Sequence, residues 1–250
     1  MVVHEIYQLS FPVRDLDASI HFYKDVLGMP GQWVNDGEFL LSAGTAQIRL
    51  RSGMDGDDLA ARKLPAFGGQ NFCLRAQGDP DTLAQQLRSA GGELVEDCVH
   101  VRAGAVGALH SIYLFDPDHN LVEVGIYQPS RLQMRITGLD HVVLVVDSLE
   151  WTMAFYQGKL GLSGKTEDGH GVVNIGVQKL NIHQGQPRYR PHVPYAAKGC
   201  VTMTLLATEE EAALCRAMEQ ADGQTEQHAL GAWDPSGNFV KILFNTVSRI

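Results

Sequence analysis

One stretch decides the fold: Val13-Arg-Asp-Leu-Asp-Ala-Ser-Ile-His-Phe-Tyr-Lys-Asp-Val-Leu-Gly-Met29. It lines up without gaps on a second stretch, Val146-Asp-Ser-Leu-Glu-Trp-Thr-Met-Ala-Phe-Tyr-Gln-Gly-Lys-Leu-Gly-Leu162, and the Phe-Tyr and Leu-Gly pairs are identical in both copies. A repeat of this kind indicates that the chain contains two related structural units.

A second pair of matching stretches extends the repeat toward the end of each half. Asp116-Pro-Asp-His-Asn-Leu-Val-Glu-Val124 matches Asp234-Pro-Ser-Gly-Asn-Phe-Val-Lys-Ile242. His119 stands where the second copy has Gly237, so we expect a residue in the left-handed backbone conformation there. The two halves meet near residue 130, which predicts two domains, 1–130 and 131–250.

Each half begins with a predicted strand and a predicted helix. The apolar runs 7–13 and 141–146 are typical of strands. Apolar residues then recur at spacings of four, three and four, and each series ends at a glycine, Gly28 or Gly161, which favours a helix that stops there. We interpret these helical residues as core: Leu16, Ile20, Tyr23 and Leu27 in the first half, and Leu149, Met153, Tyr156 and Leu160 in the second. Short strands are predicted afterwards at 38–42, 46–51, 171–175 and 179–183.

The same order of elements recurs within each half. A strand at 71–75 precedes a helix that begins near Asp79 and ends at Gly91, and a strand at 200–206 precedes a helix that begins at the acidic residues 209–211. The chain is therefore predicted to contain four βαβββ modules, at 1–65, 66–130, 131–190 and 191–250. The expected fold class is α+β, with tandem modules arranged as two domains.

The composition excludes several classes of protein. The 250 residues include 20 Lys and Arg against 29 Asp and Glu, which gives a formal net charge of −9. An acidic chain disfavours nucleic acid as a partner, because phosphate binding needs a concentrated basic surface. The apolar run at 142–146 is far shorter than the roughly 18 residues of a membrane-spanning helix. No basic and apolar leader precedes the first strand, so we expect a cytoplasmic protein.

Four cysteines are scattered singly through the chain. Cys73, Cys98, Cys200 and Cys215 form no Cys-x-x-Cys pair and no dense framework. Such spacing favours reduced thiols over disulfides or a structural zinc site. We interpret all four as buried core residues.

Three further stretches carry recognisable motifs. They are His141-Val-Val-Leu-Val-Val-Asp147 followed by Phe155-Tyr156 and Leu160-Gly161, then Lys179-Leu-Asn-Ile-His183-Gln184, and then Ser111-Ile-Tyr113-Leu-Phe-Asp116-Pro-Asp-His-Asn-Leu-Val-Glu123. Together they resemble the vicinal oxygen chelate superfamily, which includes glyoxalase I, bleomycin-resistance proteins and extradiol dioxygenases. The resemblance identifies the fold more specifically than the reaction, because this fold supports many chemistries.

The resemblance implies that two modules curl into a U-shaped cleft in which strand residues hold a divalent metal. If consecutive modules pair, each cleft contains a cation, Arg49 or Lys241, that repels a metal. If the second and third modules pair, Glu123, His141 and His183 meet in one cleft, and this arrangement explains the sequence better. Asn71 then occupies the fourth corner of that cleft, and the other cleft holds Gln8, Arg49, Thr202 and Lys241.

Two imidazoles and one carboxylate form a ligand set for Fe(II), Mn(II), Zn(II) or Ni(II). The open coordination positions accept two neighbouring oxygens of a substrate. Each residue also has an ordinary alternative role. His141 is then a hydrogen-bonded core residue, His183 an exposed residue at a strand end, and Glu123 a carboxylate that faces solvent.

Tyr113 and His110 are the candidate catalytic residues. The resemblance to dioxygenases implies that a tyrosine at position 113 donates to bound substrate, with a core role as the alternative. His110 and His100 lie in or beside the loop 101–109 and are candidates for a general base, because imidazole titrates near neutral pH. Solvated loop residues are the alternative for both. Arg102 is a candidate contact for an anionic group of the substrate.

Two functions remain open from the sequence. The first is a metal-dependent lyase or ring-cleaving dioxygenase that chelates vicinal oxygens of a small substrate. The second is a metal-free protein that binds a small aromatic or drug-like molecule, as bleomycin-resistance proteins do, with Trp33, Trp151 and Trp233 as candidate pocket residues. Both make a small molecule the expected partner. Whether two copies form a homodimer stays open.

Overall fold

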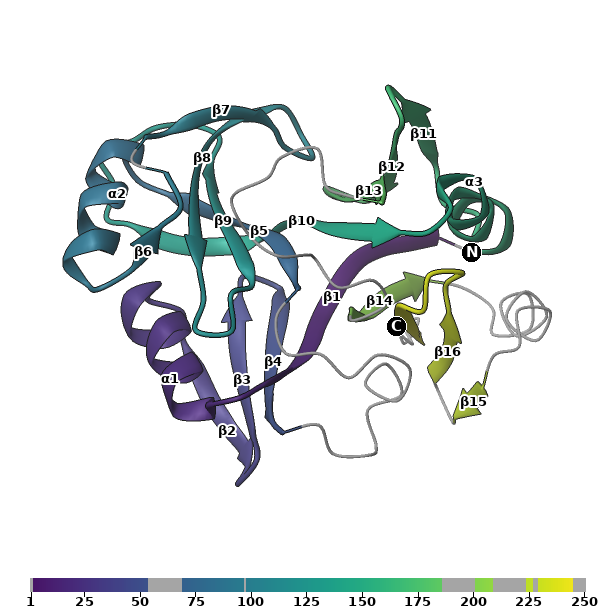
Figure 1. The fold of residues 1–250 in the computed structure, drawn as a ribbon, viewed down its shortest axis with the longest axis horizontal. Coiled ribbons are helices and arrows are strands. Elements are labelled where there is room, and N and C mark those ends of the chain that lie inside the picture. The colour runs from purple at the N-terminus through teal and green to yellow at the C-terminus, as the bar shows by residue number, and fades with distance from the viewer. Residues whose placement is uncertain are drawn as a thin grey trace, which may run out of the picture.

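The fold was obtained as a computed structural model, which describes residues 2–53, 69–96, 98–185, 201–208, 224–226 and 229–244. Two sheets dominate it, and the helices are few and short. The mixed α+β class expected from the sequence is confirmed. Figure 1 shows the two long strands β1 (Val2–Val13) and β10 (Arg135–Val146) crossing the centre of the molecule.

The first sheet combines the two ends of the chain. Among the described residues it has eight strands, in the order β15 (Gln224–Glu226), β16 (Ala229–Trp233), β17 (Phe239–Phe244), β14 (Thr202–Thr208), β1, β4 (Ala46–Ser52), β3 (Glu38–Ala43) and β2 (Gly31–Asn35). Strand β1 is parallel to β4 and antiparallel to β14. This antiparallel pair joins the first module to the last.

The second sheet is formed by the middle of the chain. Its nine described strands begin with β11 (Gly164–Glu167), β12 (His170–Ile175), β13 (Gln178–Gln184), β10 and β5 (Asn71–Gln77). They continue with β9 (Leu121–Ile126), β8 (Ala108–Phe115) and β6 (Glu93–Leu94), and β7 (His100–Ala103) also pairs with β8. Strand β10 is parallel to β13 and antiparallel to β5.

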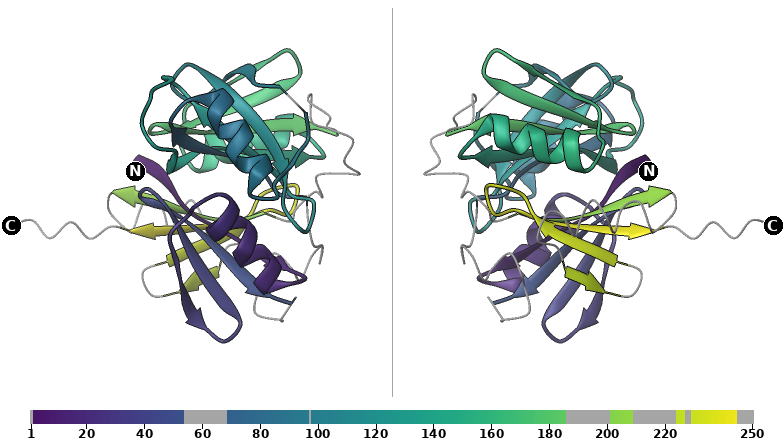
Figure 2. Two further views of the ribbon diagram at one scale, coloured as in Figure 1. Left: turned by 90° about the vertical axis from the view of Figure 1, so that its left-hand side faces the viewer. Right: turned by 90° about the vertical axis from the view of Figure 1, so that its right-hand side faces the viewer.

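The antiparallel pair β5–β10 confirms the predicted joining of the second and third modules. Figure 2 shows the result in side view, with the middle of the chain in the upper body and the two ends of the chain in the lower body. Each sheet therefore draws strands from both halves of the chain. The division into domains 1–130 and 131–250 stays a prediction about the repeat in the sequence.

The repeated stretches form matching helices, as predicted. Helix α1 (Leu16–Ile20) begins at Asp15, whose carboxylate accepts from Ala18 N. Helix α3 (Leu149–Met153) begins at Ser148, whose hydroxyl accepts from Trp151 N. These are ordinary helix caps, which satisfy backbone donors that have no partner in the first turn.

Both helices continue as wider π-helical turns, which the sequence did not predict. They are η1 (His21–Val26) after α1 and η2 (Ala154–Lys159) after α3. Each ends before a glycine with positive φ, +69° at Gly28 and +68° at Gly161, so the predicted stop signals are confirmed.

The second module has its helix where it was expected. Helix α2 (Pro80–Ser89) begins at Asp79, which accepts from Thr82 N, and Gly91 follows with φ +88°. The helix predicted from residues 209–211 onward lies outside the described residues, as do Cys200 and Cys215. Four complete βαβββ modules therefore stay a prediction.

Two equivalent hydrogen bonds tie the sheets together. Tyr23 Oη on η1 donates to Asp116 Oδ2 at 2.8 Å, and Tyr156 Oη on η2 donates to Asp234 Oδ2 at 3.2 Å. In each pair the tyrosine belongs to one sheet's modules and the aspartate to the other's. Both tyrosines are fully buried. The Phe-Tyr and Asp-Pro motifs of the sequence are therefore partners in space.

The aspartate turns also explain one unusual residue. Asp116 Oδ1 accepts from Asn120 N at 2.8 Å and closes a tight turn in which His119 has φ +61°. Gly237 has φ +88° at the matching position. The left-handed conformation expected at His119 is confirmed.

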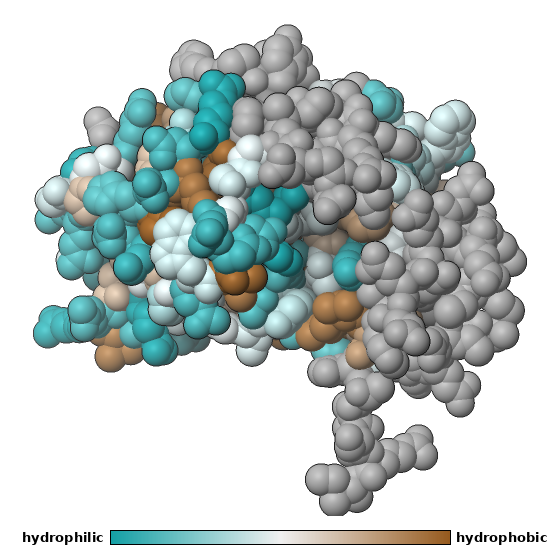
Figure 3. Space-filling model, turned by 90° about the horizontal axis from the view of Figure 1, so that it is seen from below, coloured by the Kyte–Doolittle hydropathy of each residue, from teal (hydrophilic) through white to brown (hydrophobic). Residues whose placement is uncertain are grey.

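Edge strands β2 and β11 were not located from the sequence, because they lack an alternation of buried and exposed side chains. All residues of β2 are exposed, including Trp33 at 54% and Val34 at 48%. Figure 3 shows the side of the molecule that lies lowest in Figure 1, where hydrophobic and hydrophilic residues are interspersed. Within the described ranges, no helix has the length and apolar character needed to cross a bilayer.

Candidate metal centre

A pocket of about 150 Å³ opens on the second sheet, and several predicted residues line it. The lining residues are Asn71, Arg102, Ala103, Tyr113, Leu121, Glu123, His141, Val143, Asn181 and His183. All four corner positions predicted for the cleft between the second and third modules are therefore in one pocket. Strands β5, β7, β8, β9, β10 and β13 supply its residues.

Glu123 and His141 form the polar centre of the pocket. His141 on β10 and Glu123 on β9 are both register partners of Cys73 on the intervening strand β5. His141 Nε2 lies 3.3 Å from Glu123 Oε2, and each residue is only 4% exposed. The Ser111 hydroxyl on β8 donates to the other carboxylate oxygen of Glu123.

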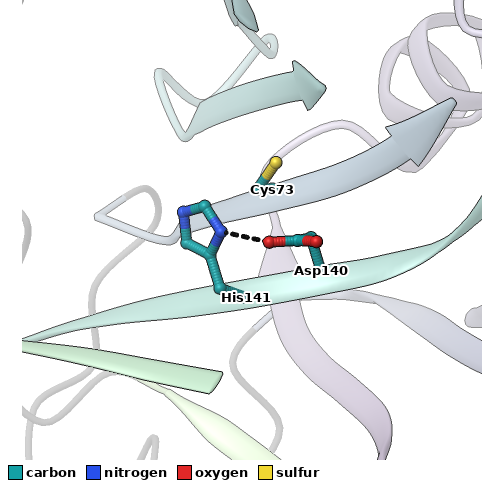
Figure 4. A group of neighbouring side chains, drawn as sticks. All are labelled: Cys73, Asp140 and His141. Carbon is teal, nitrogen blue, oxygen red and sulfur yellow. Dashed lines mark hydrogen bonds and ion pairs between the residues drawn. The ribbon is translucent and has the colours of Figure 1, made fainter. Parts of the chain in front are cut away.

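A β-bulge places Asp140 behind the His141 ring. Leu139 pairs with Leu74 and His141 pairs with Cys73, so Asp140 is an extra residue between two consecutive pairs. Bulges redirect side chains, and here Asp140 Oδ1 lies 2.9 Å from His141 Nδ1 (Figure 4). The carboxylate fixes the ring so that Nε2 faces Glu123.

Asp140 also connects the histidine to the rim of the pocket. Tyr127 Oη donates to Asp140 Oδ2, and Ala105 N donates to Asp140 Oδ1 at 2.9 Å. Lys179, the register partner of His141 on β13, donates from Nζ to Ala103 O at 2.7 Å. The end of β7 and the loop that follows it are thus attached to β10 through Asp140 and to β13 through Lys179.

The two carboxylates determine the charge of the site. Burial alone would lower the pKa of His141, but hydrogen bonds and charges from Asp140 and Glu123 outweigh burial and raise it. Burial alone would raise the pKa of Glu123, but the hydrogen bonds from His141 and Ser111 and the charge of His141 lower it. The pKa of Asp140 is lowered in the same way. The two carboxylates therefore favour a positive charge between them, on the His141 ring or on a bound cation.

This arrangement fits a divalent metal ion. Two ligands about 2.1 Å from one ion, at angles of about 90–110°, lie about 3.0–3.4 Å apart. The 3.3 Å between His141 Nε2 and Glu123 Oε2 falls in this range. A carboxylate on the other ring nitrogen is also the usual support of a metal-ligating histidine.

His183 lines the same pocket from a position further along β13. It is the register partner of Val145, four residues beyond His141 on β10. At about 3.3 Å per residue, this separates the two histidines by roughly 13 Å along the strand direction. The His183 ring stacks on His170 of β12, with centroids 5.7 Å apart.

Tyr113 and His110 lie on the same strand, β8, but on opposite faces. Tyr113 shares a face with Ser111 and lines the pocket, whereas His110 alternates with them and is not among the pocket-lining residues in the described chain. Burial, together with the charge of Glu123, raises the pKa of Tyr113 well above its usual value, although nearby Arg102 opposes this. Tyr113 is therefore a neutral hydrogen-bond donor.

The equivalent face of the first sheet has a different set of residues. Gln8 and Lys241 are both register partners of Thr204, so they occupy the positions of His141 and Glu123. The position of His183 is taken by Arg51, which pairs with Pro12, and the expectation of Arg49 there was wrong by two residues. Arg49 instead forms an ion pair with Glu38.

The three tryptophans lie away from the described pocket. Trp33 is on edge strand β2, Trp233 is on β16 of the first sheet, and Trp151 on α3 is 68% exposed. The lining residues include none of them. The prediction that the tryptophans line a drug-binding pocket is therefore not supported by this pocket.

Comparisons with known proteins agree with the fold and the motifs. Residues 5–124 match the model of the Glyoxalase/Bleomycin resistance protein/Dioxygenase superfamily. Virulence protein STM3117 of Salmonella typhimurium is 31% identical over 128 residues, which are 51% of this chain and 87% of that protein. The chain belongs to this superfamily. A second relative, the glyoxalase domain-containing protein RDO1 of Mycosarcoma maydis, is 32% identical over 52% of this chain and 72% of its own length.

Two solved structures share their fold with nearly the whole chain. A putative dioxygenase from Bacillus subtilis superimposes with a TM-score of 0.66, covering 98% of this chain and 86% of its own, at 12% identity. Glyoxalase I from Zea mays superimposes with a TM-score of 0.63, covering 97% and 92%, at 19% identity. These likenesses show the fold alone.

The sequence did not identify several residues in and around this pocket. Asp140, Ser111 and Tyr127 contact the predicted residues or each other, and Cys73 lies between His141 and Glu123 on the sheet. Cys73, Asp140 and His141 have ligand atoms within 4.8 Å of one another. The available signal was the Asp-His pair at the start of an apolar strand, which is costly to bury unless its members contact each other.

Proposed function

We propose that the chain is a metal-dependent enzyme that acts on a small substrate with two neighbouring oxygens, as a lyase or a ring-cleaving dioxygenase. Glu123 and His141 would hold the ion, with His183 as the third ligand. Fe(II), Mn(II), Zn(II) and Ni(II) suit two imidazoles and a carboxylate. One observation carries this proposal: each ring nitrogen of the buried His141 contacts a carboxylate, Nδ1 that of Asp140 and Nε2 that of Glu123.

The bound ion would act as a Lewis acid that binds two vicinal oxygens and stabilises negative charge on them. The protein residues do the remaining work. Asp140 keeps His141 in one tautomer with Nε2 toward the pocket, and Ser111 fixes the second oxygen of Glu123. Leu121 and Val143 supply apolar surface to the pocket wall beside these polar groups.

Tyr113 and Arg102 would position the substrate. The Tyr113 hydroxyl keeps its proton, so it can donate to a substrate oxygen beside Glu123. The Arg102 guanidinium lines the same pocket and suits an anionic group on the substrate. We assign the donor role to Tyr113 and not to His110, because the two point to opposite faces of β8.

The role of His183 is the most demanding part of the proposal. His183 must approach Glu123 and His141 from four residues further along the neighbouring strand. Its ring lines the pocket and stacks on His170, but side-chain rotation moves a ring by only a few ångströms, against a separation of roughly 13 Å from His141 along the strand direction. Ligation by His183 therefore requires a shift of the backbone as well, and the Mn(II) affinity of His183→Asn tests it.

Mn(II) binding tests the proposal, because Mn(II) prefers oxygen and nitrogen ligands to thiolates. Free Mn(II) can be measured by electron paramagnetic resonance while the protein is titrated. The wild-type protein should bind one equivalent, and Glu123→Gln and His183→Asn should both weaken that binding. Glu93→Gln is the matched control, since Glu93 is an exposed carboxylate on β6.

No saturable Mn(II) binding, together with no thermal stabilisation by Fe(II), Zn(II) or Ni(II), would favour the metal-free binding protein instead. A residue-specific result would refine the ligand set: unchanged affinity in His183→Asn would remove His183 from it. A homodimer and a cytoplasmic location stay predictions from the sequence.

A further inference from the structure

A second group of metal-ligating side chains lies outside the pocket. Glu96, Cys98 and His100 occupy alternate positions just before and at the start of β7, and their ligand atoms all lie within 4.8 Å of one another. Cys98 was expected to be a buried core residue, but it is exposed because it lies in the connection between β6 and β7. Its thiol is therefore open to solvent and to metal ions.

The three side chains converge on a single nitrogen atom. His100 Nε2 forms an ion pair with Glu96 Oε2 and lies 3.2 Å from Cys98 Sγ. A relay that activates a cysteine nucleophile needs the thiol and the carboxylate on different ring nitrogens, so that the ring passes a proton between them. Both partners meet Nε2 here. This geometry does not match a relay, and it brings three metal-ligating atoms within 4.8 Å of one another, so a small change of rotamer would let them surround one cation.

The chemistry of the donors indicates which cation fits. One thiolate, one imidazole and one carboxylate balance the charge of a divalent ion and leave a position for water. Sulfur favours Zn(II) or another soft or borderline metal over Mg(II), Ca(II) and Mn(II). The centre at Glu123 and His141 differs, since its proposed ligands are nitrogen and oxygen.

The surroundings of this group link it to the pocket wall. Val95 N, just before the group, donates to Tyr113 O at 2.8 Å, and His100 at its end pairs with Ser111. The His100 ring also lies 6.4 Å from the Tyr113 ring. An ion bound by Glu96, Cys98 and His100 would hold the segment between these two attachments. Strand β7, whose first residue is His100, also carries Arg102, which lines the pocket.

We propose that Glu96, Cys98 and His100 form a second, thiolate-containing metal site for Zn(II), outside the pocket and beside the strand that bears Arg102. The site does not depend on the proposed enzymatic function, because it shares no ligand with Glu123, His141 or His183.

Co(II) substitution tests the site directly, because a thiolate bound to Co(II) gives a ligand-to-metal charge-transfer band in the near ultraviolet. Wild-type protein should bind Co(II) with this band, Cys98→Ser should lose the band, and Glu96→Gln should weaken the binding. Glu123→Gln should retain the band, and Glu93→Gln is the control for the loss of an exposed carboxylate. A band that persists in Cys98→Ser, or that disappears in Glu123→Gln, overturns the assignment.

Alkylation by iodoacetamide gives a second readout that is specific to one thiol. At a free Zn(II) concentration of about 100 times Kd, mass action predicts about 100-fold slower alkylation of the Cys98 peptide. A chelator should restore the rate, and Glu96→Gln should reduce the protection while circular dichroism shows an unchanged fold. Equal alkylation rates with and without Zn(II) in the wild-type protein would contradict the proposal.

Discussion

The two sheets share one design but have different chemistry at matching positions. In the second sheet His141 and Glu123 flank Cys73, and in the first sheet Gln8 and Lys241 flank Thr204. Both sheets contain the bulge that precedes the first of these residues, at Asp140 in one and at Tyr7 in the other. The backbone therefore offers two equivalent sites, and side chains alone make one of them suitable for a metal.

Two substitutions explain why only one of the matching positions suits a metal ion. A lysine at the position of Glu123 replaces an anion by a cation, which repels a divalent ion. A glutamine at the position of His141 removes the imidazole, and Gln8 instead donates to Gln47 Oε1 at 3.0 Å. Substitutions at matching positions of the two sheets test this difference.

The largest effect is expected from Glu123→Gln. Loss of the buried carboxylate should weaken Mn(II) binding by more than about 100-fold, since removal of a supporting residue alone weakens metal sites by 10–100-fold. Lys241→Gln is the matched control at the same position of the first sheet and should leave Mn(II) affinity unchanged. Equal effects of the two substitutions would show that the sheets are not distinct in this way.

Asp140→Asn should have the next largest effect. Asp140 is a positioning residue, because it would act on the ion through the His141 ring, and its loss should weaken Mn(II) binding by about 10–100-fold. Tyr7→Phe changes the corresponding bulged residue of the first sheet and should have no effect on binding. Thermal unfolding of both variants separates loss of affinity from loss of fold. A wild-type affinity in Asp140→Asn would contradict the positioning role.

The Tyr–Asp hydrogen bonds should contribute to stability on both sides of the repeat. Tyr23→Phe removes one of the two donors to Asp116 Oδ2, since Asn120 Nδ2 also donates to it at 2.8 Å, and should lower the free energy of unfolding by about 0.5–1.5 kcal/mol. Tyr156→Phe should cost less, because the bond to Asp234 is longer, 3.2 Å against 2.8 Å. Urea unfolding measures both values, and the reverse order would contradict the comparison.

The smallest effect is expected from building a site on the first sheet. Gln8→His with Lys241→Glu, made in the Glu123→Gln background, should create weak Mn(II) binding. It should remain about 10–100-fold weaker than the natural site, because no carboxylate supports the new ring. Adding Tyr7→Asp should strengthen it. If Tyr7→Asp has no effect, the two bulges are not functionally equivalent.

Much of the fold could be predicted because the signals were local. The spacing of Tyr23 and Tyr156 with their apolar neighbours, and the glycines that follow, depend on residues within one helix. The edge strand β2 could not be located, because its exposed residues carry no alternation. The π-helical turns were missed, since their apolar spacing resembles that of an ordinary helix.

The candidate site could be predicted in part. Glu123 and His141 were found by motif, and both line the pocket together with His183. The contact between Asp140 and His141 was not predicted. The direction of the Asp140 side chain depends on a bulge, which appears only when β10 pairs with β5. For a related reason, Arg49 was predicted at the position that matches His183, where the structure has Arg51. The parallel register of β1 and β4 determines which residue lies there.

From the sequence alone came the repeat, the positions of α1, α2 and α3, several of the strands, and the residue types available for metal binding. Only the tertiary structure decided which modules share a sheet and which side chains therefore meet. The physical reason is that helix caps and apolar periodicity act over a few residues, whereas strand pairing joins residues far apart in the chain. Glu123 and His141 lie 3.3 Å apart because both strands pair with β5.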